Sequence, residues 1–116
     1  MMTDRLAAVV VNALEDLKGQ DIVRLDVRGL TDVTDILVVA SGNSTRQVKA
    51  LAEHVIEACR AAGFAPLGLE GMETAEWVLV DLGDLVLHVM LPATRAFYEL
   101  EKLWSLRPED LRRRED

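Results

Sequence analysis

Two apolar runs and the turn between them decide the fold; over residues 76–90 they read EWVLVDLGDLVLHVM. Residues 77–82 and 85–90 have the length and the β-branched content of strands. Gly83 and Asp84 between them are typical of a two-residue hairpin loop. The stretch therefore predicts an antiparallel β-hairpin, in which Leu82 lies opposite Leu85.

This register divides the hairpin side chains between two faces of a sheet, because side chains alternate along a strand. One face is wholly aliphatic and is predicted to be core: Val78, Val80, Leu82, Leu85, Leu87 and Val89. The opposite face, called the second face below, carries Trp77, Leu79, Asp81, Val86, His88 and Met90. Tryptophan beside an acid and a histidine is typical of a recognition patch. A C-terminal helix that covers the face, with His88 satisfied by a hydrogen bond, explains the same pattern.

Working outward, the sequence before the hairpin predicts two helices and two strands. Apolar residues at helical spacing indicate a helix over about residues 4–18. Residues 22–28 alternate with period two, and residues 36–40 are continuously apolar, as in a central strand. The link between these strands is too short for a crossover helix, so they are expected to be antiparallel. Ser44 and Gln47 form a capping box that starts a second helix, which ends near Gly63.

The remaining elements complete a mixed sheet. A short strand over residues 66–70 is expected to pair in parallel with residues 36–40, through a right-handed crossover. Pro92 starts a third helix, whose apolar stripe is Phe97, Leu100, Leu103 and Trp104. The predicted fold is α/β of the α+β type, a five-stranded mixed sheet flanked by helices in the order α-β-β-α-β-β-β-α. It occupies residues 1–106, and residues 107–116 form a charged tail.

Composition limits the classes of function. The chain has 116 residues, half of them hydrophobic, and a formal net charge of −7. A protein that binds bare nucleic acid is expected to be basic, so the acidic chain favours a basic protein surface or a small molecule. One cysteine and two histidines predict neither a disulfide nor a structural metal site. No apolar run suits a membrane span or a signal peptide, which predicts a cytoplasmic protein.

Residues 41–44, Ser-Gly-Asn-Ser, could hold a phosphate at a helix N-terminus, and the aspartates could hold a metal for phosphoryl transfer. Without a Walker-type lysine or a Gly-x-Gly-x-x-Gly run, capping explains residues 41–44 more simply. No closely spaced pair of carboxylates follows Ser41 and Gly42 in the helix, which argues against a nucleotidyltransferase. We therefore expect no catalytic residue, no cofactor and no metal.

Several spaced motifs together resemble the Iojap-like family, the ribosomal silencing factors. The first is DILVVASGNS with RQV, residues 35–44 and 46–48. The central block is EG at 70–71, EWVLVD at 76–81, GD at 83–84 and VLHV at 86–89. The closing helix supplies Pro92, Arg95, Phe97, Tyr98, Leu100, Glu101, Leu103 and Trp104. The resemblance covers residues 5–105, nearly the whole predicted domain.

The resemblance implies a nucleotidyltransferase-like fold without catalysis. It implies a cytosolic protein that binds the large ribosomal subunit through ribosomal protein fourteen, blocks joining of the small subunit and lowers translation in starvation or stationary growth. Family members can form homodimers. Carried over by position, the partner-binding residues are Trp77, Asp81, His88, Arg95, Tyr98, Glu101 and Trp104. Trp77 and Tyr98 are expected as aromatic anchors, Asp81 and Glu101 as partners of basic side chains, and Arg95 as a residue that orients one of these acids.

Two other hypotheses stay open from the sequence. One is an assembly or interaction module of the large subunit, in which silencing is a by-product. The other is a residual nucleotidyltransferase that uses Ser41, Gly42 and some of the aspartates. No direct binding of DNA and no membrane association is expected.

Overall fold

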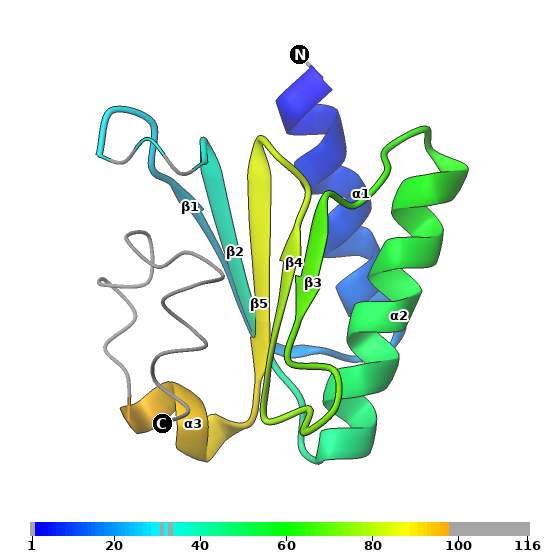
Figure 1. The fold of residues 1–116 in the computed structure, drawn as a ribbon, viewed down its shortest axis with the longest axis vertical. Coiled ribbons are helices and arrows are strands. Elements are labelled where there is room, and N and C mark those ends of the chain that lie inside the picture. The colour runs from blue at the N-terminus through cyan, green and yellow to red at the C-terminus, as the bar shows by residue number, and fades with distance from the viewer. Residues whose placement is uncertain (1, 31, 33, 98–116) are drawn as a thin grey trace.

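The elements follow the predicted order. The computed structural model describes residues 2–30, 32 and 34–97 (Figure 1). Its helices and strands are α1 (Met2–Asp16), β1 (Gln20–Asp26), β2 (Ile36–Ser41), α2 (Thr45–Ala61), β3 (Gly68–Glu70), β4 (Trp77–Asp81), β5 (Leu85–Met90) and α3 (Pro92–Phe97). The order α-β-β-α-β-β-β-α and the five-stranded mixed sheet are confirmed. Among the described helices, none has both the length and the apolar character needed to cross a membrane.

The sheet has the strand order β1-β2-β5-β4-β3. β1 and β2 are antiparallel, as the short connection between them requires. The hairpin of β4 and β5 has the predicted register, with Trp77 opposite Met90 and Leu79 opposite His88. Because β5 runs parallel to β2, the sheet is mixed.

One predicted pairing is wrong. The strand of residues 66–70 does not pair with residues 36–40; β3 pairs antiparallel with β4 at the sheet edge, and β5 lies beside β2 instead. Every residue of β2 and of β5 is buried, and a strand that is apolar on both faces is most stable at the centre of the sheet, where both faces are covered. β3 has an exposed middle residue and suits the edge. Burial, rather than chain order, decides which strand neighbours β2.

Helices α1 and α2 lie together against one face of the sheet (Figure 1). The core between these helices and the sheet contains the buried stripe of α1, the buried stripe of α2 and the aliphatic face of the hairpin. The prediction that this face is core is confirmed, since all six of its side chains are at most 8% exposed. Both helices therefore stabilise the same face, and the second face lies on the other side.

Local hydrogen bonds fix the ends of the elements. Ser44 Oγ accepts from the backbone N–H of Gln47 at 3.1 Å, and Gln47 Oε1 accepts from the N–H of Asn43 at 2.6 Å. The bond to Ser44 is the predicted N-cap of α2, whereas Gln47 reaches back to Asn43, one residue before the N–H of Ser44 that a capping box uses. Gly63, in the left-handed region at φ +92°, ends the helix as expected. β1 ends earlier than predicted, because the carboxylate of Asp26 accepts from the N–H of Arg28 and begins a turn.

Candidate partner-binding surface

The second face carries a separate buried cluster on three strands, β2, β4 and β5, and on the turn after β1. Its members are Val27, Leu37, Val39, Trp77, Leu79, Val86 and Met90. α1 and α2 pack on the opposite face of the sheet and do not belong to this cluster. The prediction that a C-terminal helix covers the second face falls on residues 98–116, outside the described residues. The same is true of Tyr98, Glu101 and Trp104.

Trp77 and His88 form a hydrogen-bonded pair in this cluster. They lie diagonally on β4 and β5, so their rings meet on one face of the sheet. Trp77 Nε1 donates to His88 Nδ1 at 2.8 Å, and the ring centroids are 5.8 Å apart. Trp77 is 7% exposed and His88 is fully buried. Of the two explanations for this face, the described residues therefore show a buried tryptophan with a hydrogen-bonded histidine.

The bond from Trp77 also determines the protonation of His88. Because Nδ1 accepts a hydrogen bond, the single proton of the neutral imidazole is on Nε2. Nε2 has no hydrogen-bond partner within the described part of the chain. Burial lowers the pKa of His88 from 6.5 to about 4, since the charged form would lose its hydration. His88 is therefore neutral near neutral pH and contributes no positive charge to this face.

Arg95 joins the same end of the second face. Ser41, the last residue of β2, lies opposite Met90, which in turn lies opposite Trp77. The guanidinium Nη1 of Arg95 donates to Ser41 Oγ at 2.9 Å, and Arg95 itself is partly exposed. α3 starts two residues after β5, which places Arg95 beside the end of β2. Nothing in the sequence pointed to Ser41 as the partner of Arg95, because the two are 54 positions apart.

Asp81 lies at the other end of β4 from Trp77, about 13 Å away at the usual rise of a strand. Its Oδ1 accepts from the backbone N–H of Gly83 at 2.9 Å and so stabilises the hairpin turn. The carboxylate is partly exposed. The expectation that Arg95 orients an acid is wrong for Asp81, because Arg95 bonds to Ser41 instead. The structure thus brings Trp77, His88 and Arg95 together and keeps Asp81 apart.

The residues that a nucleotidyltransferase would use are occupied in holding the fold. Ser41 accepts from Arg95, and Ser44 caps α2. Gly42 packs so closely that an added Cβ would lie 2.9 Å from Val48. Within residues 2–30, 32 and 34–97, no three histidine, cysteine, aspartate or glutamate side chains are grouped to hold a metal ion. This loop has the geometry of a tight strand-to-helix connection.

Comparison with known proteins points to one family. Residues 2–116 match the family model described as "ribosomal silencing factor during starvation". The chain is 49% identical over 105 residues to the ribosomal silencing factor of Chromobacterium violaceum, covering 90% of this chain and 86% of that protein. It is 36% identical over 107 residues to the mouse protein named "mitochondrial assembly of ribosomal large subunit protein 1", covering 88% of this chain and 46% of that protein.

A solved structure agrees with the sequence comparison. A crystal structure of a protein from Chromobacterium violaceum superposes with a TM-score of 0.86 at 48% identity, covering 93% of this chain and 91% of that chain. The family model spans nearly the whole chain, and the fold and the motifs of residues 35–48 and 70–90 lie within it. This chain therefore belongs to the family of ribosomal silencing factors.

Proposed function

We propose that this chain lowers translation without catalysis: it binds the large ribosomal subunit through ribosomal protein fourteen and blocks the approach of the small subunit. The observation that carries the proposal is the family match over residues 2–116. The mechanism needs only occupancy, because a rigid domain seated on the joining face of one subunit overlaps with the other subunit. No chemical step and no cofactor is required.

The charge of the chain supports a protein as the direct contact. With a formal net charge of −7, the chain is repelled by the phosphates of exposed RNA and attracted by a basic protein surface. Complementary charge of this kind speeds association and fixes orientation more than it raises affinity. We therefore place the contact on ribosomal protein rather than on ribosomal RNA.

The proposed contact surface is the second face and its edges. Asp81 and Arg95 are partly exposed and reach a partner directly. The buried pair of Trp77 and His88 shapes the sheet beneath them, and a direct contact by Trp77 as an aromatic anchor requires this face to rearrange on binding. Tyr98, Glu101 and Trp104 complete the surface as proposed from the family resemblance.

Asp81→Asn tests the surface with little risk to the fold. The amide oxygen of asparagine still accepts from the N–H of Gly83, so the turn is kept while the charge is lost. We expect weaker binding to isolated ribosomal protein fourteen, by about two- to fivefold at low salt, as for a charge at an interface rim. Glu15→Gln removes an equal charge from exposed α1 and should leave binding unchanged. Equal binding by Asp81→Asn and the unaltered chain would remove Asp81 from the contact.

Trp77→Ala is a poor probe of the same surface. Removing a buried tryptophan side chain costs about 3–5 kcal/mol of stability, so lost binding would report unfolding. Trp77→Phe keeps most of the ring volume and removes only the Nε1–H that His88 accepts. The fold of this variant is first checked by circular dichroism. Unchanged binding then shows that the shape of the face matters, and weaker binding shows that the hydrogen bond from Trp77 to His88 matters.

A second candidate function is assembly of the large subunit, which the name of the mouse relative favours. An assembly factor would bind immature large subunits in preference to mature ones, whereas a silencing factor binds mature subunits. Binding to both particles, measured side by side, distinguishes the two. We also propose that the chain acts on ribosomes of the cytoplasm, and that the free protein forms homodimers, which sedimentation equilibrium tests.

The non-catalytic part of the proposal has its own test. Ser41 and Gly42 hold the β2–α2 connection, which supports a structural role for them. Magnesium-dependent turnover of a nucleoside triphosphate by the purified chain, abolished in Asp81→Asn, would contradict the proposal and revive the nucleotidyltransferase alternative. No turnover above that of a mock purification is the expected result.

A further inference from the structure

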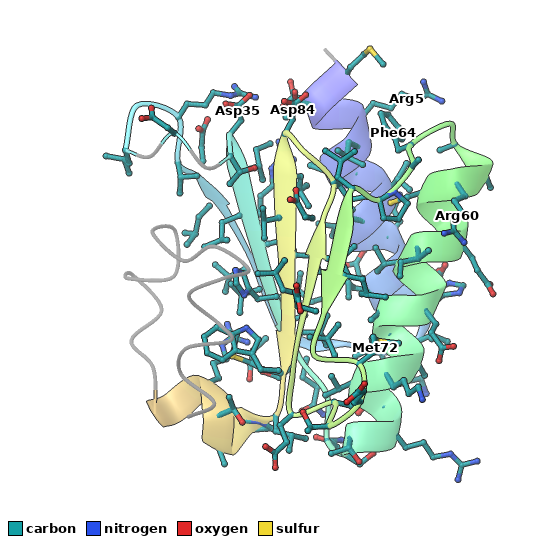
Figure 2. The ribbon with its side chains drawn as sticks, in the orientation of Figure 1. Arg5, Asp35, Arg60, Phe64, Met72 and Asp84 are labelled. Atoms are coloured by element: carbon teal, nitrogen blue, oxygen red, sulfur yellow. The ribbon has the colours of Figure 1, made fainter. Side chains whose placement is uncertain are left out.

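A groove lies between α2 and the edge strand β3, on the opposite side of the sheet from the second face. Its volume is about 290 Å³, and it is lined by Glu53, Ile56, Glu57, Arg60, Leu69 and Met72. Figure 2 labels Arg60 on α2 and Met72 on the loop that follows β3. The floor is apolar, while carboxylates stand along the helix side. None of these residues belongs to the proposed ribosome-binding surface.

The strand that borders the groove is a sheet edge. Among the described strands, β3 has β4 as its one neighbour, so β3 forms an edge of the sheet, and an edge strand can pair with a further strand through its backbone. Leu69 in β3 is 44% exposed, although large apolar side chains are usually covered. An edge strand beside an apolar groove is the arrangement in which an extended segment adds to a sheet, with backbone bonds giving affinity and alternate side chains giving specificity.

The charges of α2 specify the chemistry of that segment. Ile56 and Glu57 lie three and four positions after Glu53, and Arg60 lies four and three positions after them, so the four residues share one helical face. Within the described part of the chain, neither Glu53 nor Glu57 forms an ion pair. Both acids are exposed, so they can pair with cations without first losing a partner. Arg60 confines those cations to the Glu53 and Glu57 end of the groove.

We propose that an extended, lysine- or arginine-rich segment of another protein adds to the edge of β3. Its apolar side chains lie over Ile56, Leu69 and Met72, and its cations face Glu53 and Glu57. A second copy of this chain is the poorer occupant of this groove, because the same groove on the second copy would bring its own Glu53 and Glu57 against these two acids. This surface is separate from the ribosome-binding face, so either proposal can fail without the other.

A labelled ten-residue peptide of alternating lysine and valine is the probe. Fluorescence anisotropy at low salt should give saturable binding to the full chain, and a glutamate–valine peptide of equal length should not bind. In ¹⁵N spectra, the amide shifts should be concentrated in residues 53–60 and 68–70. Shifts concentrated at Trp77 and His88, or an absence of saturable binding, would overturn the proposal.

Two pairs of variants separate this groove from general attraction to an acidic protein. Leu69→Lys adds a cation to the groove wall and should weaken peptide binding at least tenfold. Leu30→Lys makes the same change at a 63% exposed site outside the groove and should weaken peptide binding much less. Glu53→Gln with Glu57→Gln should weaken binding about two- to tenfold; Glu15→Gln with Asp84→Asn removes equal charge elsewhere.

Equal losses in the groove pair and the control pair would show binding to net charge alone and contradict the proposal. Self-association of the chain that Leu69→Lys abolishes would assign the edge to a second copy and would contradict it as well. Each variant is checked for an unchanged circular dichroism spectrum. Apart from Leu69 in β3, the substituted residues are exposed and lie in turns or on the outer side of a helix.

Discussion

The buried His88 makes a specific prediction about stability and pH. Its imidazole is fully buried between Val39 and Leu79 on the neighbouring strands, and its pKa in the folded chain is about 4. On unfolding, the ring returns to water and regains a pKa near 6.5. Between these two values the unfolded chain binds more protons than the folded chain. The folded state therefore loses stability as the pH falls from about 6.5 towards 4.

The magnitude follows from the two pKa values. Between pH 7 and pH 5, protonation of the unfolded chain at this one position lowers the free energy of unfolding by about 2 kcal/mol. Urea denaturation at the two pH values, followed by circular dichroism, measures this loss. His88→Gln removes the titrating ring and keeps a side-chain oxygen that can accept from Trp77 Nε1. The variant is expected to be less stable at pH 7, but to lose about 2 kcal/mol less between pH 7 and pH 5.

The control is the other histidine of the chain. His54 is partly exposed on α2 and lies outside the Trp77–His88 pair, so His54→Gln leaves the buried ring of His88 and its contribution in place. If His88→Gln loses as much free energy between pH 7 and pH 5 as the unaltered chain, the ring is not buried in its neutral form. That result would refute the description of the Trp77–His88 pair.

Three further predictions concern the fold. Gly71→Ala should lower the free energy of unfolding, measured with urea, by at least about 3 kcal/mol, because φ is +88° and an added Cβ would meet the carbonyl oxygen of Trp77. The control is Gly63→Ala, at φ +92° with no heavy atom beyond those of its chain neighbours within 4 Å of an added Cβ, which should lower it by only about 1–2 kcal/mol. Ser44→Ala should cost about 1 kcal/mol in the same assay, and a cost below about 0.3 kcal/mol would show that the cap is dispensable. Burial raises the pKa of the Cys59 thiol to about 11, so iodoacetamide at pH 8 should alkylate it only after urea unfolds the chain, and rapid alkylation of the folded chain would contradict its burial.

The elements that the sequence predicted well are those set by neighbours along the chain. The register of β4 and β5 follows from the two-residue turn at Gly83 and Asp84, and the start of α2 follows from Ser44 and Gln47. Alternation within the hairpin then separated the core face from the second face correctly. Each of these features depends on interactions across only a few positions.

The errors and omissions come from competition between distant segments. Which strand lies beside β2 depends on the burial of all five strands, and the default crossover rule placed β3 there in error. The bond between Arg95 and Ser41 joins the end of one strand to a short helix far along the chain. The burial of Trp77 likewise depends on what surrounds the sheet, so the sequence left it open.

Joining of ribosomal subunits tests the central claim most directly. Purified chain is added to dissociated large and small subunits, joining is started, and the particles are separated on a sucrose gradient. The account predicts a smaller whole-ribosome peak, in proportion to the fraction of large subunits that carry the chain. An unchanged peak at concentrations where most large subunits are bound would contradict it.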